Sequence, residues 1–163
     1  MKMTMIPEIV DMDMPVEGVF HNLVIAQIKK EYAGQGQKVM NAMWGAGQMM
    51  FNKILVIADE GVTIQNYGQL AEYVFKNLDP AADIYFSQGP MDVLDHSCSK
   101  MGFGGKICID GTAKYEEERD DLQLNIKDVQ LSEGLFQNFP EIKKVNTTLL
   151  AKNIPVIILS VEK

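Results

Sequence analysis

Short, largely apolar runs alternate with helically spaced apolar residues along the first two thirds of the chain. Strands are predicted at residues 22–28, 53–58, 83–87 and 106–110. Helical spacing runs from Val39 to Met50 and, more clearly, from Tyr67 to Leu78, where Asp79-Pro80 ends it. This alternation predicts an α/β fold, specifically a three-layer sandwich with a mostly parallel sheet and helices on both faces.

Two surfaces of this fold are expected to favour self-association, so we predict a homo-oligomer. The segment from Pro7 to Pro15 alternates apolar and acidic residues, as exposed edge strands do. The first helix carries a methionine-rich face, which is either core filling or an interdomain surface. Its members are Met40, Met43, Met49 and Met50.

The end of the chain follows a different pattern. Residues 115–137 are predicted to be an acidic connecting segment, and the acidic run at 116–121 is expected to be solvated. Farther on, Pro140-Glu141-Ile142 repeats Pro7-Glu8-Ile9, and an ungapped shift of 133 gives five identities over 26 positions.

Two interpretations of residues 138–163 stay open. They are either the start of a second, truncated copy of the first module or the last strand of one larger sheet. The predicted domains are therefore 1–114, 115–137 and 138–163.

Composition narrows the functional class. A net charge of −7 argues against a nucleic-acid partner, because phosphate binding needs a basic face. The two cysteines, Cys98 and Cys108, suggest a reducing compartment, although they could also form one disulfide. The amino terminus lacks the apolar core of a signal peptide, and the run from Ile154 to Leu159 is too short to span a membrane. We expect a cytoplasmic protein.

The stretch between the last two predicted strands holds the densest candidate chemistry. Gly102-Phe-Gly-Gly-Lys106 looks like a phosphate loop, but Lys106 precedes a strand, so the glycines are expected to permit a tight strand entry. We expect a substrate edge here, because open α/β sheets form their crevice beside such loops. Four potential metal ligands also lie in this stretch, with a spacing that fits no closed zinc site: Asp92, Asp95, His96 and Cys98.

The chain shows no pattern of a nucleophilic triad. Its two histidines are His21 and His96, and neither accompanies a patterned Ser or Cys nucleophile with a base and an orienting acid. His21 is interpreted as a packed residue at the start of a strand. We predict no catalytic residue, no cofactor ligand and no metal ligand in this chain.

An ordered set of segments covering residues 6–114 resembles the carboxy-terminal domain of the UbiD family of 3-polyprenyl-4-hydroxybenzoate decarboxylases. No single segment is specific, but the order of the whole set is. The segments are Pro7-Glu-Ile-Val-Asp11, Pro15-Val-Glu-Gly18, His21-Asn-Leu-Val-Ile25, Ile28-Lys-Lys30, Lys38-Val-Met40, Met43-Trp44-Gly45, Gln48-Met-Met-Phe51, Asp79-Pro80, Gly89-Pro90-Met-Asp92, Leu94-Asp95-His96, and Lys106 with Ile109-Asp110-Gly111-Thr112.

The resemblance implies a lyase that uses prenylated FMN to remove carboxylate from aromatic or unsaturated acids, in ubiquinone or menaquinone biosynthesis. It implies a divalent metal, expected to be manganese, and potassium, which hold the flavin phosphate in the full-length enzyme. The flavin-binding domain and the catalytic network are expected upstream in the same polypeptide. This chain alone is therefore expected to bind no cofactor and to be inactive.

Within such an enzyme, the resemblance implies that this domain forms a wall beside the aromatic acid substrate and provides oligomer contacts. The expected wall residues are Pro90, Met91, Asp92 and Leu94. The alternative is a non-catalytic α/β module for binding or assembly.

Overall fold

The computed structural model describes residues 5–19, 22–119, 135–152, 154 and 156–162. The chain divides into two compact units, Met1–Arg119 and Asp120–Lys163, which are described separately below. The first unit extends beyond the predicted domain end at residue 114.

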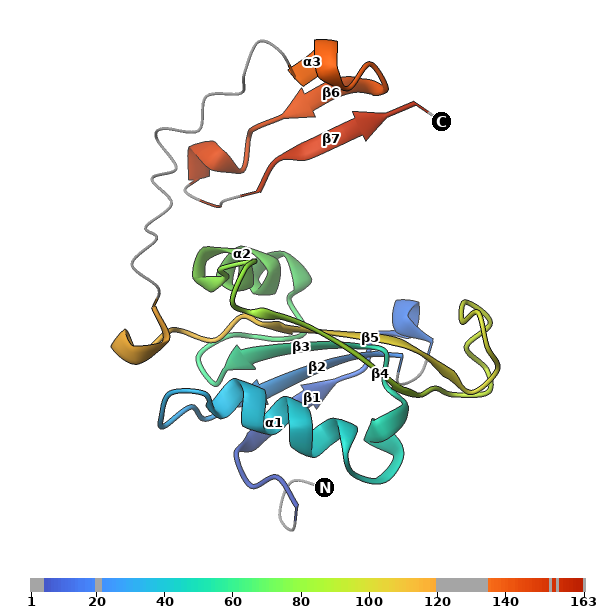
Figure 1. Ribbon diagram of the computed structural model, residues 1–163. Coiled ribbons are helices and arrows are strands. Elements are labelled where there is room, and N and C mark those ends of the chain that lie inside the picture. Colours follow the sequence, from blue (N-terminus) through green and yellow to red (C-terminus); the bar gives the residue numbers. More distant parts are fainter. Residues whose placement is uncertain (1–4, 20–21, 120–134, 153, 155, 163) are drawn as a thin grey trace. The chain divides into compact units, whose positions relative to one another are not determined.

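A five-stranded sheet in the order β1-β2-β3-β5-β4 organises the first unit (Figure 1). Three strands, β2, β3 and β5, run parallel, whereas β1 and β4 are antiparallel to their neighbours. The α/β class is confirmed, but the sheet is mixed, so the prediction of a mostly parallel sheet was wrong. The strands are β1 Ile9–Asp13, β2 Leu23–Ile28, β3 Ile54–Asp59, β4 Ile84–Pro90 and β5 Phe103–Asp110.

The connection between β4 and β5 explains why β4 is antiparallel to its neighbour. Parallel neighbours need a crossover of a dozen or more residues, usually a helix. Residues 91–102 form instead a loop that closes on itself, with Met91 N donating to Gly102 O at 3.0 Å. The two strands therefore pair antiparallel, as a hairpin.

β1 lies at one edge of the sheet, as its alternating pattern predicts. Two carboxylates on this strand accept hydrogen bonds from the segment that leads into the second helix. Gln65 Nε2 donates to Asp11 Oδ2 at 3.2 Å, and the Tyr67 hydroxyl donates to Asp13 Oδ2 at 2.9 Å. Charged side chains at a sheet edge disfavour pairing with another chain, so the carboxylates of β1 protect this edge from the addition of a further strand.

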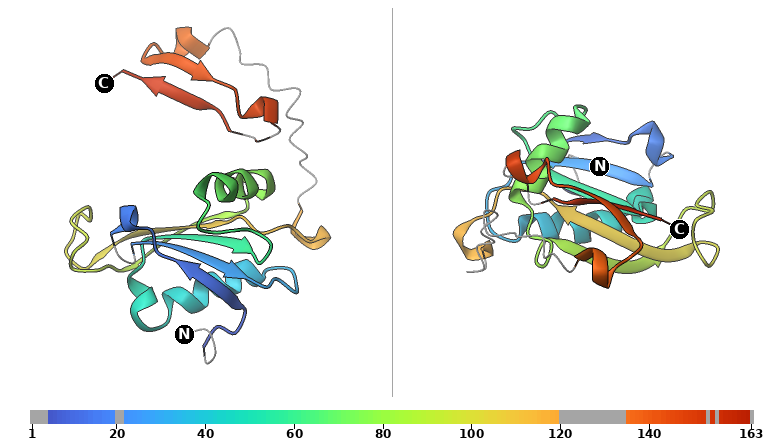
Figure 2. Two further views of the ribbon diagram at one scale, coloured as in Figure 1. Left: turned by 180° about the vertical axis from the view of Figure 1, so that it is seen from behind. Right: turned by 90° about the horizontal axis from the view of Figure 1, so that it is seen from above.

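One helix packs on each face of the sheet (Figures 1 and 2). The helix α1, Gln35–Trp44, belongs to the core cluster that contains Val24 of β2. The helix α2, Tyr67–Asn77, belongs to the cluster that contains the next residue of β2, Ile25. Successive strand residues point to opposite faces, so β2 is covered on both sides, as its continuous apolar run predicts.

The first helix ends earlier than its apolar spacing predicts. It stops at Trp44, and a separate 3-10 helix, η2, occupies Gly47–Phe51. Gly47 has a φ of 55°, a conformation that glycine adopts easily and that breaks the helical path. Most of the methionine-rich face fills the core, which is the first of the two interpretations of this face, and little of it is left as a surface for self-association. The buried members are Met40, Met43 and Met49.

The second unit contains a two-stranded antiparallel sheet. Its elements are α3 Leu135–Asn138, β6 Ile142–Asn146, the 3-10 helix η5 Leu150–Lys152 and β7 Ile158–Val161. Two further 3-10 helices lie in the first unit, η1 at Val16–Gly18 and η3 at Glu116–Glu118. Within the described ranges, no helix is long and apolar enough to cross a membrane.

Candidate functional site

The expected wall residues lie where β4 runs into the hairpin loop at 91–102. Pro90 ends β4, and Met91 is buried, only 2% exposed. Asp92 is half-buried, and its Oδ1 accepts a hydrogen bond from Leu94 N at 2.8 Å. Leu94 and its neighbour Val93 are exposed apolar side chains. The segment is therefore rooted in the fold by Met91 and presents apolar surface at Val93 and Leu94.

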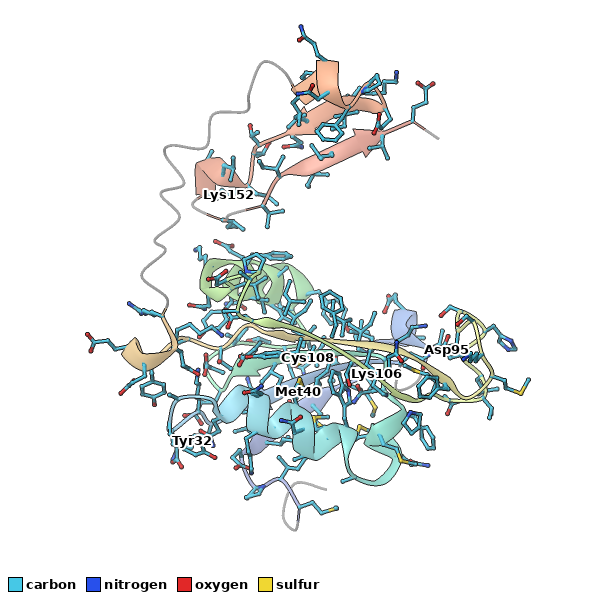
Figure 3. All side chains as sticks on the ribbon, viewed as in Figure 1. Tyr32, Met40, Asp95, Lys106, Cys108 and Lys152 are labelled. Carbon is cyan, nitrogen blue, oxygen red and sulfur yellow. The ribbon has the colours of Figure 1, made fainter. Side chains whose placement is uncertain are left out.

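Asp95 anchors the loop to the sheet (Figure 3). Its side chain is only 3% exposed, and Lys53 Nζ, which lies just before β3, forms an ion pair with Asp95 Oδ2 at 2.9 Å. Asp95 also accepts hydrogen bonds from Ser97 N at 2.9 Å and from Cys98 Sγ at 3.1 Å. Lys53 donates to Ser97 as well. These bonds hold the first half of the loop against the amino end of β3.

The electrostatics of this anchor favour an ionised Asp95. Burial works to raise the pKa of Asp95, but hydrogen bonds from Ser97 and Lys53 outweigh it and hold that pKa well below its ordinary value. Hydrogen bonding to Asp95 raises the pKa of Lys53 in turn. The pair is therefore charged at neutral pH.

Lys106 holds the base of the hairpin from the face that α1 covers. It is 4% exposed, and its Nζ donates to Met50 O at 2.7 Å and to Asn52 O at 2.6 Å. The Trp44 ring lies 5.9 Å from this nitrogen. Burial lowers the pKa of Lys106 to about 8. Figure 3 shows Lys106 on the same strand as Cys108, near α1.

The glycine-rich segment that precedes Lys106 is part of a strand. β5 begins at Phe103 and continues through Lys106 to Asp110, so Gly104 and Gly105 lie within the strand and do not form the tight entry that the sequence led us to expect. The segment opens a strand and no helix, unlike a phosphate loop. Gly104 lies beside the loop: a Cβ there would stand 2.7 Å from Cys98 Sγ. This position therefore needs glycine because the loop packs closely on the strand.

The hairpin loop does not lie where the crevice argument places it. Ligands of open α/β sheets bind outside the carboxyl ends of the parallel strands. Because β4 is antiparallel to β5, the loop between them lies at the amino end of β5, and β5 is parallel to β3. The loop is therefore at the opposite end of the sheet from the crevice that the sequence argument assumed.

The carboxyl ends of the parallel strands carry a polar group that sequence analysis missed, here called the carboxyl-end cluster. Lys30 Nζ donates to Thr112 Oγ1 at 3.0 Å and to Glu118 Oε2 at 2.6 Å. The Asp110 carboxylate accepts from Thr112 N at 3.0 Å and from Thr112 Oγ1 at 2.6 Å. Its members are Lys30, Asp59, Asp110, Thr112 and Glu118; Asp59 Oδ2 accepts a hydrogen bond from Ala113 N at 2.7 Å, and Lys30 Nζ donates to Ala113 O at 2.8 Å.

A signal for this cluster was present in the sequence, because polar residues follow three strands whose carboxyl ends meet at one edge. Glu118 also corrects the picture of a solvated acidic run. Its side chain is 15% exposed and pairs with the buried Lys30, and its Oε1 accepts from Gly34 N at 2.7 Å. These bonds tie η3 to the first unit and carry that unit past residue 114.

The four potential metal ligands do not form a metal site. His96 is exposed, whereas Asp95 and Cys98 are engaged with Lys53. Across the described part of the chain, no group of three or more His, Cys, Asp or Glu residues could hold a metal ion. Cys98 and Cys108 are both free thiols. His21 lies outside the described residues.

The family profile of the 3-octaprenyl-4-hydroxybenzoate carboxy-lyase carboxy-terminal domain matches residues 1–111. The chain belongs to this family. The match spans the whole sheet of the first unit, including the hairpin loop and the start of the carboxyl-end cluster. The resemblance of this chain to the carboxy-terminal domain of the UbiD family is thereby confirmed.

Relatives of this UbiD domain are found in longer proteins. An uncharacterised protein of Aquifex aeolicus is 42% identical over 113 residues, 69% of this chain and 23% of its own length. One of Archaeoglobus fulgidus is 44% identical over 113 residues, 69% of this chain and 24% of its own. One of Helicobacter pylori is 33% identical over 158 residues, 96% of this chain and 25% of its own. The chain spans about a quarter of each.

Solved structures of UbiD-class enzymes share the fold. The vanillic acid decarboxylase of Sedimentibacter hydroxybenzoicus in its open form is 25% identical, with a TM-score of 0.65, over 83% of this chain and 28% of that enzyme. HmfF of Pelotomaculum thermopropionicum, solved in complex with FMN, is 19% identical, with a TM-score of 0.60, over 80% of this chain and 28% of that enzyme. The HmfF match supports the fold alone.

Proposed function

We propose that the first unit is the three-layer carboxy-terminal domain of a prenylated-FMN-dependent decarboxylase that acts on aromatic or unsaturated carboxylic acids. The observation that carries the proposal is the family match over residues 1–111. The similarity to a vanillic acid decarboxylase supports an aromatic acid as substrate. Because this chain spans about a quarter of its relatives, the flavin-binding domain is assigned to another part of the same polypeptide.

The described residues of this chain do not fit the cofactor or its metal. They gather no set of three metal ligands, and the glycine-rich segment is a strand without the helix that a phosphate loop opens. No chemical step through the flavin is therefore assigned to these residues. Prenylated FMN, the divalent metal and potassium are proposed for the rest of the full-length enzyme.

The proposed contribution of this domain is a wall on the substrate side, formed by Pro90, Met91, Asp92 and Leu94. Two features support it. Met91 is buried and Asp95 is anchored to Lys53, so both ends of the short apolar tip are fixed. Val93 and Leu94 are 71% and 56% exposed, which leaves their apolar surface free to contact a substrate ring. A wall of this kind selects by shape and supplies no proton transfer.

Truncation of Leu94 to alanine in the full-length enzyme is expected to change substrate preference. An apolar pocket discriminates by about 1–3 kcal/mol per methylene, so kcat/KM ratios between acids of different ring substitution should shift by roughly 10-fold or more. Flavin content, measured from the absorbance of the purified enzyme, should stay unchanged. The matched control is Met101→Ala, an exposed apolar residue in the same loop but outside the wall. Equal kcat/KM ratios in both variants would refute the wall.

A further inference from the structure

The two strands of the second unit pair in the same register as β1 and β2. In the first unit, Ile9 pairs with Ile28, and after a bulge Asp13 pairs with Ile25. In the second unit, Ile142 pairs with Val161, and after a bulge Asn146 pairs with Ile158. Each of these residues follows its counterpart by 133 positions, the shift that aligns the two Pro-Glu-Ile motifs. The remaining pairs agree as well, and so does the place of the bulge.

Hydrogen bonds outside the strands repeat with the same shift. Lys29 N donates to Glu8 O at 2.9 Å, and Glu162 N donates to Glu141 O at 2.9 Å. The turn that enters the hairpin also repeats: Ile9 N donates to Ile6 O, and Ile142 N donates to Phe139 O. A β-bulge is a specific feature of a strand pair, so its recurrence at one sequence shift is a far stronger sign of duplication than five identities.

The two hairpins differ in how much they are covered. In the first unit β3 pairs with the free side of β2, and Ile25 and Ile28 are 4% and 0% exposed. Their counterparts in β7, Ile158 and Val161, are 51% and 63% exposed. Strands that are apolar on both faces are typical of sheets covered on both sides. β7 therefore has the sequence of a central strand without the neighbours of one.

The relative that aligns over more of this chain is also the longer protein. The Aquifex aeolicus and Archaeoglobus fulgidus proteins, each of which aligns with 113 residues of this chain, are about 490 and 470 residues long, since 113 residues are 23% and 24% of them. The Helicobacter pylori protein aligns across both units and is about 630 residues long, since 158 residues are 25% of it. The extra length is sufficient for a whole second module.

We propose that residues 135–162 open a second copy of the module and that the free edge of β7 is the docking site of a parallel strand. The occupant is a segment farther along the same polypeptide that is equivalent to α1 and β3. Its strand pairs with β7 as β3 pairs with β2. Its helix covers the face that carries Val161 and Ile142, as α1 covers the equivalent residues Ile28 and Ile9. In this proposal the second copy is completed by a later segment of the full-length polypeptide. The proposal does not depend on the decarboxylase assignment.

Hydrogen exchange, measured on the full-length polypeptide and on the 163-residue chain, tests this docking site. Amides of β7 should exchange at least roughly 100-fold more slowly in the full-length polypeptide, because paired central strands open only with the whole module. Amides of β2 are the internal control, since β1 and β3 already flank that strand. Equal exchange of β7 in the two forms, or a full-length polypeptide with no strand paired to β7, would overturn the proposal.

A substitution distinguishes a covered strand from a free one. Ile158→Asp should speed exchange throughout the second module of the full-length polypeptide by roughly 100-fold, because it buries a carboxylate without a partner. In the 163-residue chain the same change should have little effect, because this side chain is half exposed. Thr147→Asp, at an exposed position between β6 and β7, is the matched control and should be silent in both forms. Equal effects of Ile158→Asp in the two forms would contradict a covered β7.

Discussion

Replacement of Gly36 by alanine is expected to lower the free energy of unfolding of the first unit by about 3 kcal/mol. A Cβ at this position would stand 2.0 Å from Asp110 Oδ2 and 2.5 Å from its Cγ. The carboxylate cannot move aside easily, because it is buried and bonded to Thr112 N and Oγ1. Either α1 shifts away from the carboxyl end of β5, or Asp110 loses the hydrogen bonds that compensate its burial.

Urea denaturation of the 163-residue chain measures this effect through the fluorescence of Trp44, the single tryptophan, which lies in α1. Gly68→Ala is a matched control. Gly68 is the second residue of α2, as Gly36 is of α1, but a Cβ there meets its nearest atom at an ordinary 3.7 Å. The control should be neutral or stabilising by about 0.5–1 kcal/mol. Equal midpoints for the two variants would contradict the close approach of α1 to Asp110.

Replacement of Asp95 by alanine is expected to release the hairpin loop. It removes the partner of Lys53 and the acceptor for Ser97 and Cys98, at a cost of about 2–3 kcal/mol in local stability, somewhat below that of a fully buried pair because Lys53 is partly exposed. Trypsin reports on the loop directly, because Lys100 lies exposed within it. Cleavage after Lys100 should accelerate by roughly 30–100-fold, since 1.4 kcal/mol corresponds to a factor of ten.

The pH dependence of this anchor has a definite sign. The folded pKa of Asp95 lies below its ordinary value, so its contribution to stability is complete above about pH 5 and is lost progressively as the pH falls from there through the folded value. Loop protection should therefore be constant between pH 8 and pH 5.

Ser99→Ala, at an exposed position in the same loop, is the control for the Asp95 substitution and should leave the rate of tryptic cleavage unchanged. Similar cleavage rates for the Asp95 and Ser99 variants would show that the ion pair does not anchor the loop.

The sequence predicts the parts of this fold that depend on local apolar patterns. The continuous apolar run of β2 correctly indicates burial on both faces, and the spacing from Tyr67 to Leu78 correctly indicates α2. The antiparallel direction of β4 could not be predicted in the same way, because the period of two is the same for both pairings. It follows from a hairpin loop that the Met91–Gly102 hydrogen bond closes and that Asp95 ties to Lys53, across 42 positions of sequence.

The candidate site, like the fold, could be predicted from the sequence only in part. The sequence locates the segment of Pro90 to Leu94 by resemblance, but not which of its side chains are anchors and which are exposed. Met91 is buried close to Gly104 of the neighbouring strand, where an added Cβ would stand 3.4 Å from Met91 Cγ, and no local pattern reports this approach. The carboxyl-end cluster is different, because polar residues directly after parallel strands are a readable signal. Glu118 could not be found that way, since its acidic neighbours make it look solvated.

Release of CO2 tests the claim that this chain is one domain of a larger decarboxylase. The full-length polypeptide and the 163-residue chain would each be supplied with prenylated FMN and a panel of aromatic and α,β-unsaturated carboxylic acids. If the chain is the carboxy-terminal domain of a decarboxylase whose chemistry resides elsewhere, the full-length polypeptide releases CO2 from at least one acid and the 163-residue chain releases none. CO2 from the isolated chain, or none from a flavin-loaded full-length polypeptide with any acid of the panel, would contradict that claim.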